Sequence, residues 1–258
     1  MTVLEPRAWS VAVIRLPAWL SGRRAHRPSN RPIKERRPQP GGRSLILVNT
    51  HWWPRGGYGP FVVRDRLAKG DVPKDMDEFE TQILQTTAGI ADGDRGYLRL
   101  LAAIEPLIKA GETVVVTGDF NEPSHEDWTE AAAQRGMDRW VKNPSGRPLR
   151  FKIAWAGSVA LKRVGLQDAY RTVFPDEVAK PGNTWTPPYK TGLPGRCAHD
   201  SQVLDRIDRI HFAGPGLQVT AAAVVGESRQ ACEIVHDGPW VSDHRAVLVT
   251  FRLTEASE

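Results

Sequence analysis

The chain has 258 residues and a formal net charge of +5, but the positive charge is confined to one end. Residues 1–43 hold ten of the 35 basic and two of the 30 acidic side chains, so the rest of the chain has a net charge of −3. These values do not indicate a uniformly basic nucleic-acid-binding domain. A membrane-spanning helix is excluded because no apolar run approaches about 20 residues. Two cysteines, Cys197 and Cys232, are too few for a disulfide framework, although they could pair.

The beginning of the chain does not have the pattern of a signal peptide. In residues 9–22, Arg15 and Pro17 interrupt the apolar run, and Glu5 stands where a signal peptide has its positive flank. A cytoplasmic location is therefore favoured. Residues 21–43 are rich in Pro, Arg and Gly and almost lack apolar side chains, so we expect them to be irregular and exposed.

From residue 44 onward the sequence alternates short apolar runs with amphipathic segments. The apolar runs, each ended by polar residues or glycine, predict strands over 45–50, 113–118, 206–212, 217–225 and 246–251. Helices are predicted over 75–90, 94–110 and 124–135, the second bent by Pro106 and the third capped by Ser124. Interleaved strands and helices, with strands dominating the second half, predict a layered α/β domain.

Polar clusters stand at the ends of four predicted strands. They are "NTH" (49–51), "GDFN" (118–121), "RID" (206–208) and "SDH" (242–244). Layered α/β folds gather their functional sites at such strand ends. In "GDFN", the alternation of an extended chain points Asp119 and Asn121 to one side and Phe120 into the core. A carboxylate beside an amide suits a hydrated divalent metal and a phosphate oxygen; the alternative is an Asp/Asn turn after a strand.

Taken together, the motifs resemble the endonuclease/exonuclease/phosphatase superfamily, which has the deoxyribonuclease-I-like fold. The resemblance rests on "NTH", "GDFNEPS", "TWTP" (184–187), "DRIDRIHF" and "SDHRAV", in the family's order, and covers roughly residues 44–253. It implies a layered α/β sandwich of two stacked mixed β-sheets flanked by helices, here over residues 44–254 after a basic segment 1–43. It also implies phosphoester cleavage with Mg²⁺ or Mn²⁺, as in nucleases, sphingomyelinase-like phosphodiesterases and inositol phosphate phosphatases.

The resemblance assigns the central catalytic role to His244, which would assist the attacking water or the charge of the phosphorane. Asp208 would accept a hydrogen bond from its ring and fix its tautomer. Asp205 is the alternative partner, but the R-I-D frame favours Asp208.

The same resemblance assigns roles to the remaining strand ends. Asp119 would position the nucleophilic water and help bind the metal, Asp243 would bind the metal, and Asn121 would hold a phosphate oxygen. His51 would donate to a non-bridging oxygen. Trp185 in "TWTP" is a candidate substrate contact. His211, which follows "RID" on the same predicted strand, is expected to face solvent.

Two motifs of the family are not found before Asn49. The family's fold begins with a strand that carries an Asn and a strand that ends in a metal-binding Glu, and only Glu5 and Glu35 are acidic in the first 48 residues. We therefore expect a fold incomplete at its N-terminal side and weak or absent activity, since Mg²⁺ is usually held by one or two protein carboxylates. The alternative is a non-catalytic remnant or binding module.

The expected partner is a phosphoester substrate, which could be nucleic acid, a lipid headgroup or a sugar phosphate. The acidic body weighs against tight nonspecific binding of duplex DNA, which needs many Lys and Arg contacts. Aromatic side chains near the strand ends could stack on a base, a sugar or a headgroup, or could serve as core anchors; they are Trp52, Trp53, Tyr58, Trp185, Tyr189 and Trp240. A monomer is expected.

Overall fold

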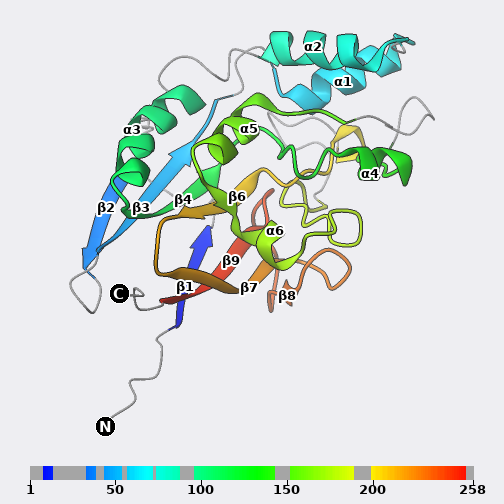
Figure 1. Ribbon diagram of the computed structural model, residues 1–258. Coiled ribbons are helices and arrows are strands. Elements are labelled where there is room, and N and C mark those ends of the chain that lie inside the picture. The colour runs from blue at the N-terminus through cyan, green and yellow to red at the C-terminus, as the bar shows by residue number, and fades with distance from the viewer. Residues whose placement is uncertain are drawn as a thin grey trace, which may run out of the picture.

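The computed structural model shows two β-sheets packed face to face, with helices on the outer side of the larger sheet (Figure 1). It describes residues 8–13, 33–38, 44–53, 57–71, 74–87, 96–142, 152–188 and 199–253. Each sheet contains one parallel pair of strands among antiparallel ones. The predicted layered α/β fold with two stacked mixed sheets is confirmed.

The larger sheet has the strand order β2–β3–β4–β6–β5. Its strands are β2 (Ile33–Pro38), β3 (Ser44–His51), β4 (Thr113–Asp119), β5 (Gln167–Asp168) and β6 (Asp208–Ala213). Because β3 and β4 run parallel and β6 runs antiparallel to them, the last residues of β3 and β4 lie beside the first residue of β6. His51 is in register with Asp119, and Asp119 with Asp208. Strand pairing alone gathers three predicted site residues.

The smaller sheet has the strand order β1–β9–β7–β8. Its strands are β1 (Ala8–Val13), β7 (Leu217–Gly226), β8 (Ile234–Val235) and β9 (Ala246–Leu253). The long strands β7 and β9 pair over most of their length, with one irregularity between Val219 and Ala221. These two strands form the centre of the sheet and present alternate side chains to the larger sheet.

Apolar side chains from both sheets fill the space between them. Val115 of β4 and Ile210 and Phe212 of β6 meet Val224 of β7 and Val247, Val249 and Phe251 of β9. The rings of Phe212 and Phe251 lie 5.5 Å apart, centroid to centroid. Burial of apolar area at about 25 cal/mol per Å² is the main force that holds the two sheets together.

The outer face of the larger sheet is covered by α3 (Tyr97–Lys109) and α5 (Ala156–Arg163) (Figure 1). Leu100 and Ile104 of α3 pack on Val114 and Val116 of β4, whose neighbour Val115 faces the other sheet. Strand β4 is thus buried on both faces, which explains its unbroken run of β-branched residues.

Of the other described helices, α1 (Gly59–Ala68), α2 (Met76–Thr87), α4 (Glu130–Gln134) and the 3-10 turn His199–Ser201 lie beyond the strand ends of the larger sheet (Figure 1). Helix α6 (Ala169–Val173) instead packs on β6 and β7, and its Ala169 and Tyr170 side chains belong to the core between the sheets. Helices α1 and α2 pack with Trp128, Trp140 and Trp155 in a third apolar cluster. Helix α1 was not predicted, because its polar and apolar residues do not separate onto two faces. Within the described residues, no helix is long and apolar enough to cross a bilayer.

Two predictions of local structure need correction. Residues 21–43 were expected to be irregular, but Ile33–Pro38 form β2, which pairs with β3 along its whole length; the rest of that segment lies outside the described residues. The helix predicted over 124–135 is limited to Glu130–Gln134, capped by the Thr129 side chain, which accepts a hydrogen bond from the Ala132 amide. Ser124 instead caps a preceding turn, where its hydroxyl accepts from the Glu126 amide.

Candidate active site

The predicted site residues meet where β3 and β4 end and β6 begins. His51 and Asp119 are the last residues of their strands, Asp208 is the first residue of β6, and His244 precedes β9 of the other sheet. The backbone of Trp185 bridges that of His244, which joins the two sheets at this point. The structure therefore brings side chains from both sheets to one location.

His244 and Asp208 form a buried pair. The ring Nδ1 of His244 lies 2.8 Å from Oδ2 of Asp208, and both side chains are almost fully shielded from solvent. A carboxylate at this distance accepts a hydrogen bond, so it selects the tautomer that carries the proton on Nδ1. The lone pair then lies on Nε2, which is 3.9 Å from Oδ2 of Asp243. The arrangement suits a histidine that takes up or gives a proton at Nε2.

Backbone and side-chain contacts hold both members of this pair in place. The Asp208 amide donates to the Thr184 hydroxyl at 3.0 Å, and the His244 amide donates to Ser242 at 3.1 Å. The indole N–H of Trp240 donates to the His244 carbonyl at 2.8 Å. These bonds fix the chain on either side of the His–Asp contact.

Asp119 and Asn121 form a tight turn at the end of β4. Oδ1 of Asp119 accepts from the Asn121 amide at 2.9 Å, and Oδ2 lies 3.4 Å from both His51 Nε2 and Asn121 Nδ2. Asn121 has a φ of +47°, a left-handed conformation that Asn tolerates better than most residues. Its side-chain amide also donates to the Trp52 carbonyl at 2.9 Å. The simple Asx turn is thus present, but it also aims the Asp119 carboxylate at His51.

The donor set of this site fits a divalent cation. Asp119, Asp208 and His244 each offer a ligand atom, and these atoms all lie within 4.8 Å of one another. Carboxylate oxygens are the protein ligands that Mg²⁺ and Mn²⁺ prefer. Asp243, with a side chain 18% exposed, adds a further carboxylate at the rim. Since Asp208 is engaged by the His244 ring, Asp119 and Asp243 are the carboxylates suited to share a cation with substrate and water.

Asp205, the alternative partner of His244, points into the protein. Its carboxylate accepts from the Tyr58 hydroxyl and from the Trp128 indole, each at 2.9 Å, and Arg139 lies 3.5 Å away. Burial raises the pKa of Asp205 to about 6, although Arg139 and the two hydrogen bonds lower it. Its role is therefore to tie α1 and the tryptophan cluster to the strand that carries Asp208.

Some of the aromatic side chains near the strand ends are buried in the core, and others are exposed. Trp52 and Tyr58 are buried, and Trp185 packs edge-on against Tyr58 and 6.2 Å from the His244 ring. Trp240 is half-buried, and Trp53 is 51% exposed. Tyr189 lies outside the described residues. Among the described members of this aromatic set, Trp53 thus has the most surface available for a substrate.

The family assignment rests on a match over most of the chain. A family model described as the Endonuclease/Exonuclease/phosphatase family matches residues 2–244. The chain belongs to this family. The match begins well before residue 44, so the resemblance extends further toward the N-terminus than the motifs alone indicate.

Individual relatives of the family are distant. Uncharacterized protein F14F9.5 of Caenorhabditis elegans is 28% identical over 145 residues, which cover 54% of this chain and 40% of the relative. A 3'-5' exonuclease (NExo) from Neisseria meningitidis is 17% identical with a TM-score of 0.43, covering 92% of this chain and 69% of that one. An AP endonuclease from Archaeoglobus fulgidus is 16% identical with a TM-score of 0.40, covering 84% and 63%. The chain thus spans less than half the length of the curated relative.

The contacts of Thr184 and Trp240 with the His–Asp pair were not predicted, although Thr184 lies in "TWTP" and Trp240 was a candidate for stacking. Both residues bind backbone atoms of the pair, and no local sequence pattern marks such a contact. His211 is buried rather than facing solvent, because it pairs with Asp168 of β5 and its ring packs edge-on against Phe120. Burial lowers the pKa of His211 to about 3, so its ring is neutral. Asn49 donates to Thr117 at 3.1 Å, as a strand-end residue would.

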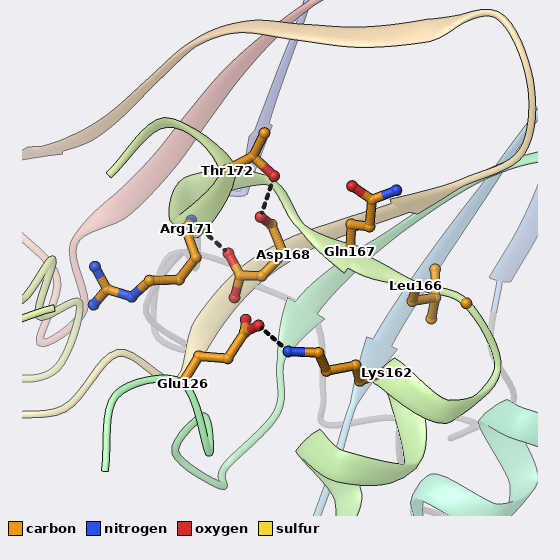
Figure 2. Close-up of a pocket in the computed structure, with 8 residues that line it drawn as sticks. Glu126, Lys162, Leu166, Gln167, Asp168, Arg171 and Thr172 are labelled. Carbon is orange, nitrogen blue, oxygen red and sulfur yellow. Dashed lines mark hydrogen bonds and ion pairs between the residues drawn. The ribbon is translucent and has the colours of Figure 1, made fainter. Parts of the chain in front are cut away.

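A cavity of about 360 Å³ lies away from these residues, between α5, β5 and α6. Figure 2 shows its lining, where Lys162 of α5 pairs with Glu126 and the Asp168 carboxylate caps the first turn of α6. The Arg171 side chain is bound to Asp127. Because its charged groups are already paired, this cavity offers no reactive group, and the chemistry is assigned to the strand ends. Cys232 is a buried free thiol, and Cys197 lies outside the described residues.

Proposed function

We propose that this chain is a metal-dependent phosphoesterase whose reaction centre is the cluster of His244, Asp208, Asp119, Asn121 and His51. The observation that carries the proposal is the buried His244–Asp208 pair, with its Nδ1–Oδ2 distance of 2.8 Å, placed within ligand distance of Asp119. Phosphoester hydrolysis needs a water held for attack, donors for the phosphate oxygens and a group that moves a proton. Each of these needs has a matching side chain here.

Each side chain of this cluster would have its own role in the hydrolysis. The Asp119 carboxylate would accept a hydrogen bond from the attacking water and orient it toward phosphorus. His244 would exchange a proton at Nε2, while Asp208 holds the ring tautomer and stabilises the imidazolium. Asn121 and His51 would donate to non-bridging oxygens, whose negative charge increases in the transition state. When bound, Mg²⁺ or Mn²⁺ supplies charge neutralisation at the phosphate and lowers the pKa of water.

Cation binding can be tested without an assay for turnover. Asp119 and Asp243 are expected to hold the cation weakly, so the thermal midpoint should rise only at millimolar Mn²⁺, following RT ln(1 + [L]/Kd). Asp119→Asn should abolish the rise. Asp200→Asn removes an exposed carboxylate of the 3-10 turn and should preserve it. A wild-type midpoint that does not respond to Mn²⁺ would instead favour a non-catalytic binding module of the same fold.

Trp53 is the side chain proposed to contact the substrate. This side chain is 51% exposed, and it follows Trp52, whose carbonyl binds the Asn121 side chain. A base or aryl group could stack on its indole, and such stacking contributes about 1–3 kcal/mol per ring. A nucleotide end or another phosphodiester with a planar group is therefore favoured over a sugar phosphate.

Trp53→Ala should raise the KM for thymidine 5'-p-nitrophenyl phosphate by about tenfold, since the lost stacking free energy is of that size. The KM for methyl p-nitrophenyl phosphate should change less, because it lacks the base. Met76→Ala removes another exposed apolar side chain, on α2 and outside the site, and should change neither value. Equal KM changes for both substrates in Trp53→Ala would rule out stacking of the base.

A further inference from the structure

Glu122 directly follows Asn121, and its carboxylate is buried against the first turn of α5. Its two carboxylate oxygens accept hydrogen bonds from the backbone amides of Gly157 at 3.2 Å and Ser158 at 2.8 Å. The first amides of a helix have no partner within the helix, so a carboxylate there is a strong acceptor placed at the positive end of the helix dipole. Only 4% of Glu122 is exposed. A buried acid at this position is not explained by the chemistry assigned above.

The backbone of Glu122 is fixed as well. Its carbonyl accepts from Nη1 of Arg209 at 2.9 Å, and Arg209 follows Asp208 on β6. One residue thus links three elements: the turn after β4, the start of α5 and the start of β6. Asn121 lies at the centre of these links, in a left-handed conformation that the surrounding structure must maintain.

The turn after β4 and the start of α5 are tightly packed against each other. A Cβ atom added at Gly157 would lie 2.5 Å from the Trp52 ring and 2.7 Å from Oε2 of Glu122. Trp52 in turn provides the carbonyl that accepts from the Asn121 side chain. Gly157 therefore lets α5 approach both partners that determine where the Asn121 amide lies.

We propose that Glu122 is a positioning residue, which clamps the turn after β4 onto the N-terminus of α5 and thereby sets the Asn121 amide for a phosphate oxygen. The proposal rests on the phosphoesterase function proposed above. Loss of the clamp would let the Asn121 turn relax and move its donor away from the charge that develops on the phosphate. Misplacement of a binding group by about 1 Å can lower a rate by about 10²-fold.

The main test compares kcat and KM in Mn²⁺ for hydrolysis of thymidine 5'-p-nitrophenyl phosphate. Glu122→Ala should lower kcat about tenfold to 10²-fold, with KM nearly unchanged, because Asn121 acts on transition-state charge. Glu122→Gln keeps one carbonyl acceptor and should lose less. Gly157→Ala disturbs the same clamp from the helix side and should reproduce the loss. The control Glu126→Gln removes an acid that contacts the same helix through Lys162 and should leave kcat unchanged.

A double-mutant cycle separates positioning from a general loss of stability. In an Asn121→Ala background, Glu122→Ala should lower kcat little further, because the group it positions is already absent. Fully additive losses would overturn the proposal. So would a kcat that Glu122→Ala leaves unchanged while only the melting temperature falls.

A measurement without turnover keeps this test separate from the proposed function. In the ¹⁵N-labelled chain, the side-chain amide resonances of Asn121 should shift and exchange faster in Glu122→Ala, and should stay in place in Glu126→Gln. If wild-type chain showed no hydrolysis but this shift appeared, the phosphoesterase proposal would fail and the clamp would stand. Unchanged Asn121 resonances in Glu122→Ala would overturn the clamp whatever the activity.

Discussion

His244→Ala should lower Mn²⁺-dependent hydrolysis of bis-p-nitrophenyl phosphate by about 10²–10⁴-fold, the usual contribution of a positioned acid–base group. The loss follows from the geometry, because Nδ1 of His244 is bound to Asp208 and Nε2 is left to exchange the proton. The measurement is initial rate at millimolar Mn²⁺, where the weakly held cation is present in the site. Wild-type turnover itself is expected to be low.

Two further variants test whether a lower rate of hydrolysis in His244→Ala comes from loss of its acid–base group. Asp208→Asn keeps the shape of the pair but removes the charge that stabilises the imidazolium, and should lower the rate by on the order of 10²-fold. Asp237→Asn removes an exposed acid of the same loop and should keep turnover close to wild type. A His244→Ala variant that hydrolyses as fast as wild type, with an unchanged thermal midpoint, would remove His244 from the mechanism.

The strands of the fold were more predictable from the sequence than the helices. β4 is a run of β-branched residues because both of its faces are buried, and such a run is visible without any alignment. Helix α1 has no apolar face, and β2 contains four charged residues and one proline among its six residues, so neither shows periodicity. β2 forms because β3 offers it an edge to pair with. That contact is set by the tertiary structure and not by local preference.

The residues of the candidate site also differ in how far the sequence predicts them. Asp119, Asp208 and His244, whose side chains the structure brings together, could be selected from the sequence because they stand in short motifs at strand ends. Thr184 and Glu122 also lie in short motifs, "TWTP" and "GDFNEPS", but their roles could not be predicted. Each acts through a hydrogen bond to the backbone of a segment more than twenty residues away. Sequence order does not reveal which helix start will lie beside which turn.

The largest expected effect on stability concerns a buried ion network beside the site. Arg206 is 1% exposed; its Nη1 lies 2.7 Å from Asp168, and its Nη2 lies 3.0 Å from Asp127. Burial would raise the pKa of both carboxyls, but Arg206, helped by Arg171 at Asp127 and by Arg209 at Asp168, outweighs burial and holds both pKa values below the usual range. Removing one partner leaves uncompensated buried charge.

Arg206→Met should therefore lower the free energy of unfolding by about 3–5 kcal/mol at pH 7.5, measured by urea denaturation. Arg135→Met, which removes an exposed partner of Asp176, should leave the urea midpoint unchanged. The pH dependence gives a second check. In wild type the lowered pKa values give stability that is complete above the unfolded-state pKa and lost as pH falls through the folded-state values.

In Arg206→Met the sign of this pH dependence should reverse. Without Arg206, Asp127 keeps its ion pair with Arg171, but Asp168 loses its main charge partner. Burial then raises the folded-state pKa of Asp168 above that of the unfolded chain. The folded variant then binds protons more tightly than the unfolded chain as pH falls, which restores part of its stability. The deficit relative to wild type should accordingly be smaller at pH 4.5 than at pH 7.5. A deficit that is the same at both values would mean that lost packing, and not unpaired charge, destabilises the variant.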